Sequence, residues 1–256
     1  MRRPRGTSLK DVQDAEALIA LRDLVGSPSA LSAPACLPFG LPEIDARLPH
    51  GGLSLGSLHE VAPDSDADAA AALGFTLALV ARHLALAEGE AVLVMGRGHP
   101  TPYGHGLVDL GLDPGRLLLF EVETDTEVYQ AVEESLHAQG LRAVAGLVDA
   151  GLPLTQSRRL HLAAGGTGLL LLILRPAQAV EANVAATRWR IAGAAASRDR
   201  FGCILKPRWR VHLDRCRNGR TGHWLLEWDH AAHRFGLAGT LADHAPEAGH
   251  GRYAQG

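Results

Sequence analysis

The sequence predicts an α/β fold in which a mostly parallel sheet is covered by helices on both faces and is finished by antiparallel strands. Apolar runs such as 91–95 and 143–148 lack the alternation of polar and apolar residues that marks a half-exposed strand. Segments with helical periodicity separate these runs, as parallel pairing requires. After Arg188 the pattern changes to alternating polarity with an Asn218-Gly219 turn, which is typical of an antiparallel ribbon.

Each predicted element follows from the spacing of its apolar residues. The helix at 68–88 places Leu73, Leu77, Val80 and Leu84 on one face. Strands are predicted at 57–61, 91–95, 117–122, 143–148, 168–174, 188–191, 209–214 and 224–228, and helices at 68–88, 126–139 and 155–164, with a short one near Leu107.

The composition indicates a globular chain with one large α/β domain and appended segments. Of its 256 residues, 46% are hydrophobic and 21% are charged, which excludes a disordered or fibrous chain. The longest apolar run, 169–174, is too short for a membrane-spanning helix, which needs about 20 residues, so we expect no membrane association. Three cysteines cannot form a disulfide scaffold, and the N-terminus lacks a secretory pattern, so we expect a cytoplasmic protein.

Four regions are expected along the chain. They are an N-terminal amphipathic helical arm at 1–25, a linker at 26–38, the α/β core at 39–240 and a disordered tail at 241–256. The helix of the arm spans 8–25, and Ser, Ala and Pro dominate the linker. Such an arm suits either a groove on a neighbouring subunit or partner, or packing against its own core.

The turn between strand 57–61 and helix 68–88 is where α/β folds of this order usually hold a phosphate group. A phosphate loop, G-x-x-x-x-G-K-[ST], brings backbone amides to the phosphates through its glycines, while the lysine neutralises them and the hydroxyl holds magnesium. The corresponding residues here are Ala62, Pro63, Asp64, Ser65, Asp66, Ala67, Asp68 and Ala69, and none of the four defining positions matches.

The three carboxylates of this turn would oppose a polyphosphate. Like charges ~4 Å apart repel by ~4 kcal/mol at an effective dielectric constant of about 20. The same carboxylates stabilise the N-terminus of a helix. We therefore expect Asp64, Asp66 and Asp68 to begin a structural helix, and we expect no nucleotide cofactor.

Asp149 ends the strand 143–148, where a nucleotidase of this architecture usually has a carboxylate that orients magnesium. A glutamate that activates water is expected after strand 91–95, but Met95-Gly96-Arg97-Gly98 contains no acid. A single carboxylate at a strand end more often caps a helix or forms a salt bridge. The sequence therefore predicts no catalytic residues and no ATPase activity.

Basic residues gather in the stretch 188–220, within a chain whose net charge is −3. Neutralisation of phosphates by arginine and stacking on Trp189 and Trp209 would hold single-stranded DNA. A hairpin with a solvated charged face explains the same pattern, so both interpretations stay open. The candidate DNA contacts are Arg208, Arg210, Arg215, Arg217 and Arg220.

Other reactive side chains form no recognised site pattern. Neither candidate set of zinc ligands has the paired spacing that zinc sites use, so we expect no metal. Ser54 and Ser157 lack the context of a nucleophile elbow. Cys36, in the predicted linker, is expected to act as a small apolar residue. The two zinc sets are Cys203, His212, Cys216 and His223, and His223, His230 and His233.

Two sequence blocks resemble known proteins. The segment Phe39-Gly40-Leu41-Pro42-Glu43-Ile44-Asp45, with LPHGGL at 48–53 and GSLHEV at 56–61, resembles the opening of the RecA-like recombinase core. The block RWRVHLDRCR at 208–217, followed by Asn218-Gly219-Arg220 and WLLEW at 224–228, is similar to the antiparallel strands that close that core. Together with the lost phosphate loop, these blocks resemble the ImuA family over residues 39–240.

The resemblance implies a RecA-like core that works without catalysis in the SOS response. The family is an accessory component of error-prone translesion DNA synthesis, encoded with ImuB and an error-prone polymerase. It implies protein contacts with the ImuB-like polymerase homologue and its associated polymerase, with RecA and single-stranded DNA as further candidates. Two alternatives remain: a DNA-dependent ATPase of RecA type with an atypical cleft, and an inhibitor of cell division similar to SulA.

Overall fold

The computed structural model describes residues 35–179, 181–198, 201 and 204–238. The predicted arm at 1–25, most of the predicted linker, the predicted tail at 241–256 and Cys203 lie outside the described residues. The last two residues of the predicted linker before Pro38 form a short strand, β1 (Cys36–Leu37), which pairs antiparallel with β2 (Leu53–Ser54).

The core is a nine-stranded sheet in the order β11-β10-β9-β8-β3-β7-β6-β4-β5. All pairs from β8 to β5 are parallel, and those from β8 to β11 are antiparallel, which confirms the predicted α/β class and its antiparallel end. The strands are β3 (Ser57–Pro63), β4 (Glu90–Gly96), β5 (Leu117–Val122), β6 (Leu141–Leu147), β7 (Leu170–Leu174), β8 (Thr187–Arg198), β9 (Ile204–Cys216), β10 (Gly222–Asp229) and β11 (Arg234–Leu237).

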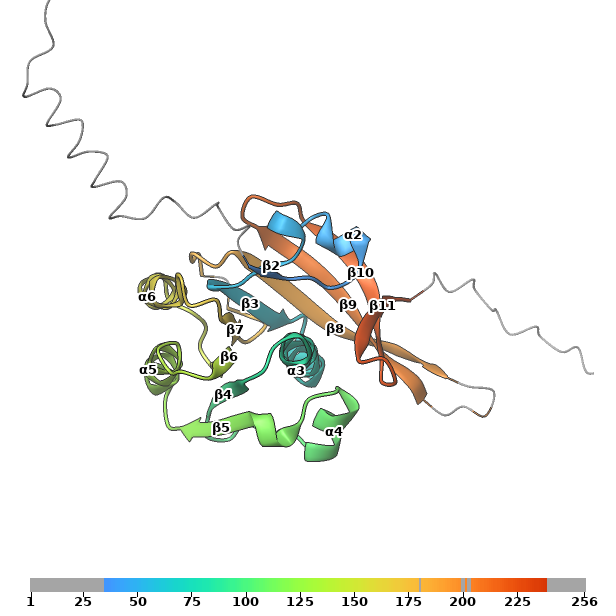
Figure 1. Ribbon diagram of the computed structural model, residues 1–256, viewed down its shortest axis with the longest axis horizontal. Coiled ribbons are helices and arrows are strands. Elements are labelled where there is room, and N and C mark those ends of the chain that lie inside the picture. Colours follow the sequence, from blue (N-terminus) through green and yellow to red (C-terminus); the bar gives the residue numbers. More distant parts are fainter. Residues whose placement is uncertain (1–34, 180, 199–200, 202–203, 239–256) are drawn as a thin grey trace, which may run out of the picture. The chain divides into compact units, whose positions relative to one another are not determined.

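Helices cover both faces of the parallel part of the sheet. Figure 1 shows α5 and α6 on one face, and α3 and α4 on the other. Two separate apolar clusters, one on each face, follow from this layering. The helices are α2 (Pro42–Asp45), α3 (Ala69–Leu86), α4 (Gly104–Asp109), α5 (Asp125–Ser135) and α6 (Leu154–Ala164), with 3-10 turns η1 (Pro49–Gly51), η2 (Asp66–Asp68) and η3 (Pro114–Arg116).

Helix α3 is the central helix of the fold. The span Asp66–Leu86 is long and apolar enough to cross a membrane. An 18-residue window within it has a mean hydropathy of 1.7, and 56% of that window is buried within the protein. It packs against β3, β6, β7 and β8. Phe75 of α3 lies 6.2 Å from the ring of Trp189 and 5.6 Å from that of Phe235, between ring centroids. The apolar character of α3 is thus explained by its contact with the sheet.

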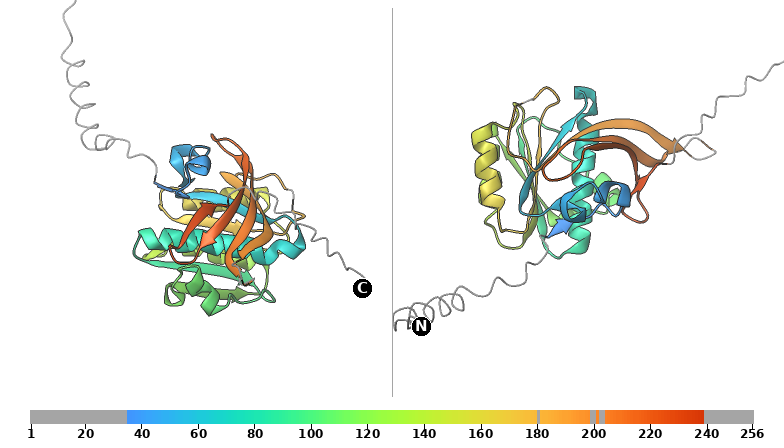
Figure 2. Two further views of the ribbon diagram at one scale, coloured as in Figure 1. Left: turned by 90° about the vertical axis from the view of Figure 1, so that its right-hand side faces the viewer. Right: turned by 90° about the horizontal axis from the view of Figure 1, so that it is seen from above.

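Element boundaries differ from the predictions where local patterns are weak. Helix α5 starts with a capping box between Thr124 and Glu127 but ends at Ser135, four residues early, because the next amides bond three residues back. Strands β8 and β9 extend well past the predicted ends and curve strongly (Figure 2). The small residues 192–196 carry no alternation of polarity, so only the pairing with β9 reveals this extension.

Candidate functional site

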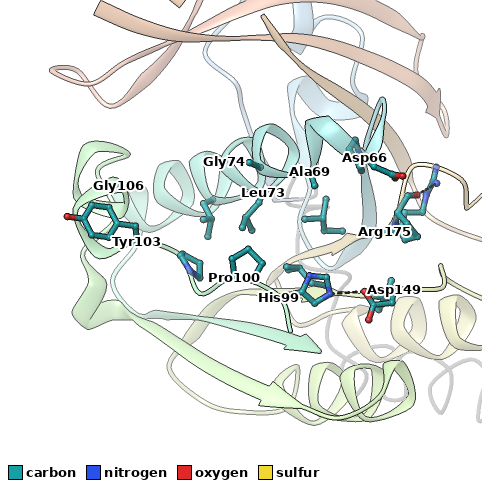
Figure 3. A pocket seen from close by; sticks show the side chains of 18 of the residues that line it. Asp66, Ala69, Leu73, Gly74, His99, Pro100, Tyr103, Gly106, Asp149 and Arg175 are labelled. Carbon is teal, nitrogen blue, oxygen red and sulfur yellow. Dashed lines mark hydrogen bonds and ion pairs between the residues drawn. The ribbon is translucent and has the colours of Figure 1, made fainter. Parts of the chain in front are cut away.

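A cavity of about 660 Å³ lies at the carboxyl ends of the parallel strands, between α3 and the segment that follows β4. This is where α/β folds usually bind ligands. Pro63, Leu147 and Leu174, the last residues of β3, β6 and β7, form one wall. Figure 3 shows α3 along the opposite wall, with Ala69, Leu73 and Gly74 facing the space.

The lining is mostly alanine, leucine and proline, and its polar side chains are few. Asp66, Asp149 and Arg175 gather at one end of the cavity, while Tyr103 lies at the other (Figure 3). Tyr103 is 73% exposed. Such a surface favours apolar groups over the phosphates of a nucleotide, because burying a charge without a partner is costly.

The three carboxylates of the turn 62–69 accept hydrogen bonds from four different residues. Asp64 Oδ1 accepts a hydrogen bond from Arg190 Nη1 at 3.1 Å. Asp66 accepts from Nε2 of Gln178 at 2.8 and 2.9 Å. Asp68 accepts from the Ser65 hydroxyl at 2.6 Å and from the backbone amide of Gly193 at 2.8 Å. The turn is therefore fastened to β8 and to the segment after β7.

Asp66 and Asp68 lie in the 3-10 turn η2, immediately before α3, whereas Asp64 precedes the N-cap residue Ser65 and its amide bonds to β8. Two of the three carboxylates expected at the helix start therefore lie there. Neither Ser65 nor Asp68 makes a side-chain capping bond to the helix, so the carboxylates of Asp66 and Asp68 act on the helix start through their charge. Hydrogen bonds from Ser65 and Gly193 lower the pKa of Asp68 below its ordinary value. Among the eight residues of the turn, those that line the cavity are Pro63, Asp66, Ala67 and Ala69.

Asp149 lies two residues beyond β6 and at the rim of the cavity. Its Oδ1 is 3.0 Å from Nε2 of His99, and its side chain is 72% exposed. The carboxylate of Asp125 accepts from the backbone amides of Asp149 and Ala150, which holds the loop in place. Arg97, where a catalytic glutamate would be expected, lies 2.7 Å from Glu123.

A buried charge cluster beside the cavity was not predicted from the sequence. Glu60 of β3 is fully buried, and its Oε2 accepts from Nε of Arg188 at 2.8 Å. Its Oε1 lies 3.5 Å from Nε of Arg175 and accepts from Nδ2 of Asn183 at 2.5 Å. The one sequence signal for it is an acidic residue within the apolar run 58–62.

His59, next to Glu60, is the centre of a buried hydrogen-bond chain. Its Nε2 donates to the carbonyl oxygen of Ser54 at 2.9 Å, which leaves Nδ1 to accept from the hydroxyl of Thr187 at 2.7 Å. The indole of Trp189 donates to the same hydroxyl oxygen at 2.7 Å. Burial lowers the pKa of His59 to about 4, so the imidazole is neutral at pH 7.

Three of the five candidate arginines have partners within the described part of the chain. Arg208 pairs with Glu227 at 3.2 Å, and the guanidinium groups of Arg215 and Arg220 donate to the carbonyl oxygens of Asn183 and Ala46. The exposed residues Arg210 and Arg217 form no ion pair within the described part of the chain. The five candidates thus differ in how much charge they can offer to DNA.

The candidate zinc ligands and nucleophiles named from the sequence form no site within the described residues. The rings of His212 and His223 stack at 5.8 Å between centroids. Among residues 35–179, 181–198, 201 and 204–238, no three His, Cys, Asp or Glu side chains are placed to hold a metal ion. The Ser157 hydroxyl donates to the carbonyl oxygen of Leu154, and the thiol of Cys36 donates to that of His50.

Two known proteins resemble this chain over most of its length. Both are called Protein ImuA and come from two strains of Caulobacter vibrioides. Each is 38% identical over 234 residues, which covers 83% of this chain and 94% of the relative. No protein-family model matches the chain.

Proposed function

The chain belongs to the ImuA family, and we propose that it is a non-catalytic accessory protein of damage-induced translesion DNA synthesis. In this proposal it acts in the cytoplasm as a RecA-like scaffold through protein contacts, chiefly with an ImuB-like homologue of the polymerases. The associated error-prone polymerase and RecA are further partners. Family membership supports a place in the translesion mutagenesis system, and the architecture of the cleft supports the absence of catalysis.

The proposal rests on which residues line the 660 Å³ cavity at the carboxyl ends of the parallel strands. A nucleotide there would meet an apolar wall of α3 and the Asp66 carboxylate, without the lysine and hydroxyl of a phosphate loop. Asp64 and Asp68 are engaged with Arg190 and Gly193, so the turn that would wrap a phosphate is fixed to β8 instead.

Calorimetric titration of the full chain with ATP and Mg²⁺ tests this directly. We expect no saturable heat at about 1 mM nucleotide and no hydrolysis in the presence of single-stranded DNA. Saturable binding that is lost in the variant Asp149→Asn would contradict the proposal and favour the DNA-dependent ATPase. The exposed variant Glu121→Gln, on β5, serves as the matched control because it also removes one carboxylate.

Exposed apolar side chains on the edge strand β5 support the proposed protein contacts. Leu118, Leu119 and Phe120 are 41%, 40% and 50% exposed, and β5 has no further strand beside it among the described residues. Edges of this kind readily add another chain. We expect Leu119→Lys combined with Phe120→Lys to weaken capture of a co-expressed ImuB-like partner by at least about tenfold.

A matched control keeps this experiment specific. Leu86 of α3 and Leu162 of α6 are 65% and 78% exposed, so Leu86→Lys combined with Leu162→Lys introduces the same two charges away from β5 and is expected to leave capture unchanged. Capture of the division-ring protein in place of the ImuB-like protein would overturn the proposal in favour of a SulA-like inhibitor.

A further inference from the structure

A second cavity, of about 220 Å³, lies at the amino end of the parallel strands. Ser57, the first residue of β3, lines it, whereas Pro63 at the other end of the same strand lines the larger apolar cavity. Its walls come from the segment 49–57, from α6, from the start of β8 and from the turn after β9.

Polar side chains with unused hydrogen-bonding groups line this cavity. The hydroxyls of Ser54 and Ser57, the amide of Asn218 and the guanidinium of Arg217 make no side-chain hydrogen bond within the described part of the chain. His161 also lines the cavity, and its Nδ1 is buried without a partner among these residues. A buried polar atom normally has a partner, so the Nδ1 of His161 indicates a missing ligand. The other four groups belong to exposed or half-buried residues and are free to bind that ligand.

The residues that line the cavity carry positive charge and no negative charge. None of the residues that line it is an aspartate or glutamate, and Arg217 supplies a full positive charge. Burial lowers the pKa of His161, and the nearby charge of Arg217 lowers it further. Both ring nitrogens of His59 are already hydrogen-bonded, to Ser54 and Thr187, so its neutral ring has no donor left for a ligand. The remaining groups can all act as donors, which favours an anion that accepts several hydrogen bonds.

We propose that this cavity binds a phosphate group, with Arg217, His161, Ser54, Ser57 and Asn218 as its donors. A phosphate accepts hydrogen bonds on several oxygens at once, and arginine matches its geometry. The volume leaves room for the group and several waters, each of which occupies about 30 Å³ in the liquid. The phosphate comes either from the free ion or from the phosphodiester backbone of single-stranded DNA. This inference stands independently of the proposed scaffold function, because it involves neither the apolar cleft nor the protein partner.

The test follows the side-chain NMR signals of His161 in the full chain, assigned by their loss in His161→Gln. Addition of inorganic phosphate at constant ionic strength is expected to raise the pKa of His161 by about 1 to 3 units, because a bound anion stabilises the imidazolium. A short single-stranded oligonucleotide is titrated in parallel. A shift with phosphate alone identifies the free ion as the ligand, and a shift with the oligonucleotide identifies the phosphodiester.

Substitutions of Arg217 and a comparison with acetate test the proposal further. Arg217→Gln is expected to weaken phosphate binding by at least about tenfold, with partial recovery in Arg217→Lys. Arg234→Gln removes an exposed charge on β11 outside the cavity and is expected to have no effect. The proposal is overturned if neither probe moves the pKa of His161, if acetate acts as strongly as phosphate, or if Arg217→Gln binds phosphate normally.

Discussion

The carboxylate of Glu60 and the guanidinium of Arg188 form a buried ion pair, 2.8 Å between Oε2 and Nε, that joins the neighbouring parallel strands β3 and β8. Glu60 is completely buried, and Arg175 lies 3.5 Å from its other oxygen. Removing one partner of such a cluster strongly lowers the free energy of unfolding, because the remaining charges stay in an environment of low dielectric constant.

We therefore expect Glu60→Gln to lower the free energy of unfolding by about 3–5 kcal/mol, measured by urea denaturation. Glu133→Gln is the control, since Glu133 forms an exposed pair with Arg159 and its loss is expected to cost at most about 1 kcal/mol. Equal costs for the two substitutions would show that the buried pair has no special role.

The buried imidazole of His59 predicts a dependence of stability on pH. Its pKa is about 4 in the folded protein and 6.5 without burial, so the unfolded chain binds an extra proton between these values. The free energy of unfolding should therefore fall as the pH drops below 6.5, by roughly 2 kcal/mol between pH 7 and pH 5 from this group. Below pH 4 its contribution stops changing.

Urea denaturation at several pH values measures this effect, and the variant His59→Gln should reduce the slope. His83 and His161 also have lowered pKa values, chiefly through burial, and act in the same direction. A stability that does not change between pH 7 and pH 5 would contradict the neutral, buried state of His59.

Two phenylalanines provide a comparison between the core and the sheet edge. Phe75 is fully buried among the rings of Phe39, Trp189, Trp209 and Phe235. Phe75→Ala is expected to cost about 3–5 kcal/mol of unfolding free energy, whereas Phe120→Ala on the exposed edge should cost less than about 1 kcal/mol. A similar loss at both positions, measured by chemical denaturation, would argue that β5 is covered in the native protein.

Two of the arginines proposed to contact single-stranded DNA differ in whether a carboxylate neutralises them. Arg210 forms no ion pair within the described residues, whereas Arg208 is neutralised by Glu227. If the outer face of β9 binds the strand, Arg210→Ala should reduce the slope of log affinity against log salt by about 1, and Arg208→Ala by clearly less. Fluorescence anisotropy at several salt concentrations measures both slopes, and two unchanged slopes would remove this face as a DNA-binding surface.

The sequence by itself determined most of the helices and strands, and it determined that the first strand-to-helix turn has no phosphate loop. Apolar periodicity placed β4, β5, β6, α3 and α6 close to their observed bounds, because the spacing of buried residues is a local property of the chain. The absence of phosphate-loop residues at 62–69 is equally local, since such a loop depends on a few consecutive positions.

The tertiary structure alone decided which side chains meet. The pairs Glu60–Arg188 and His59–Thr187 each join residues 128 positions apart, and Asp64–Arg190 joins residues 126 apart. These contacts exist because β8 lies beside β3, and no local pattern encodes the neighbour of a strand in a parallel sheet. The phosphate-sized cavity has the same origin, because its donors come from four segments that only the folded sheet brings together.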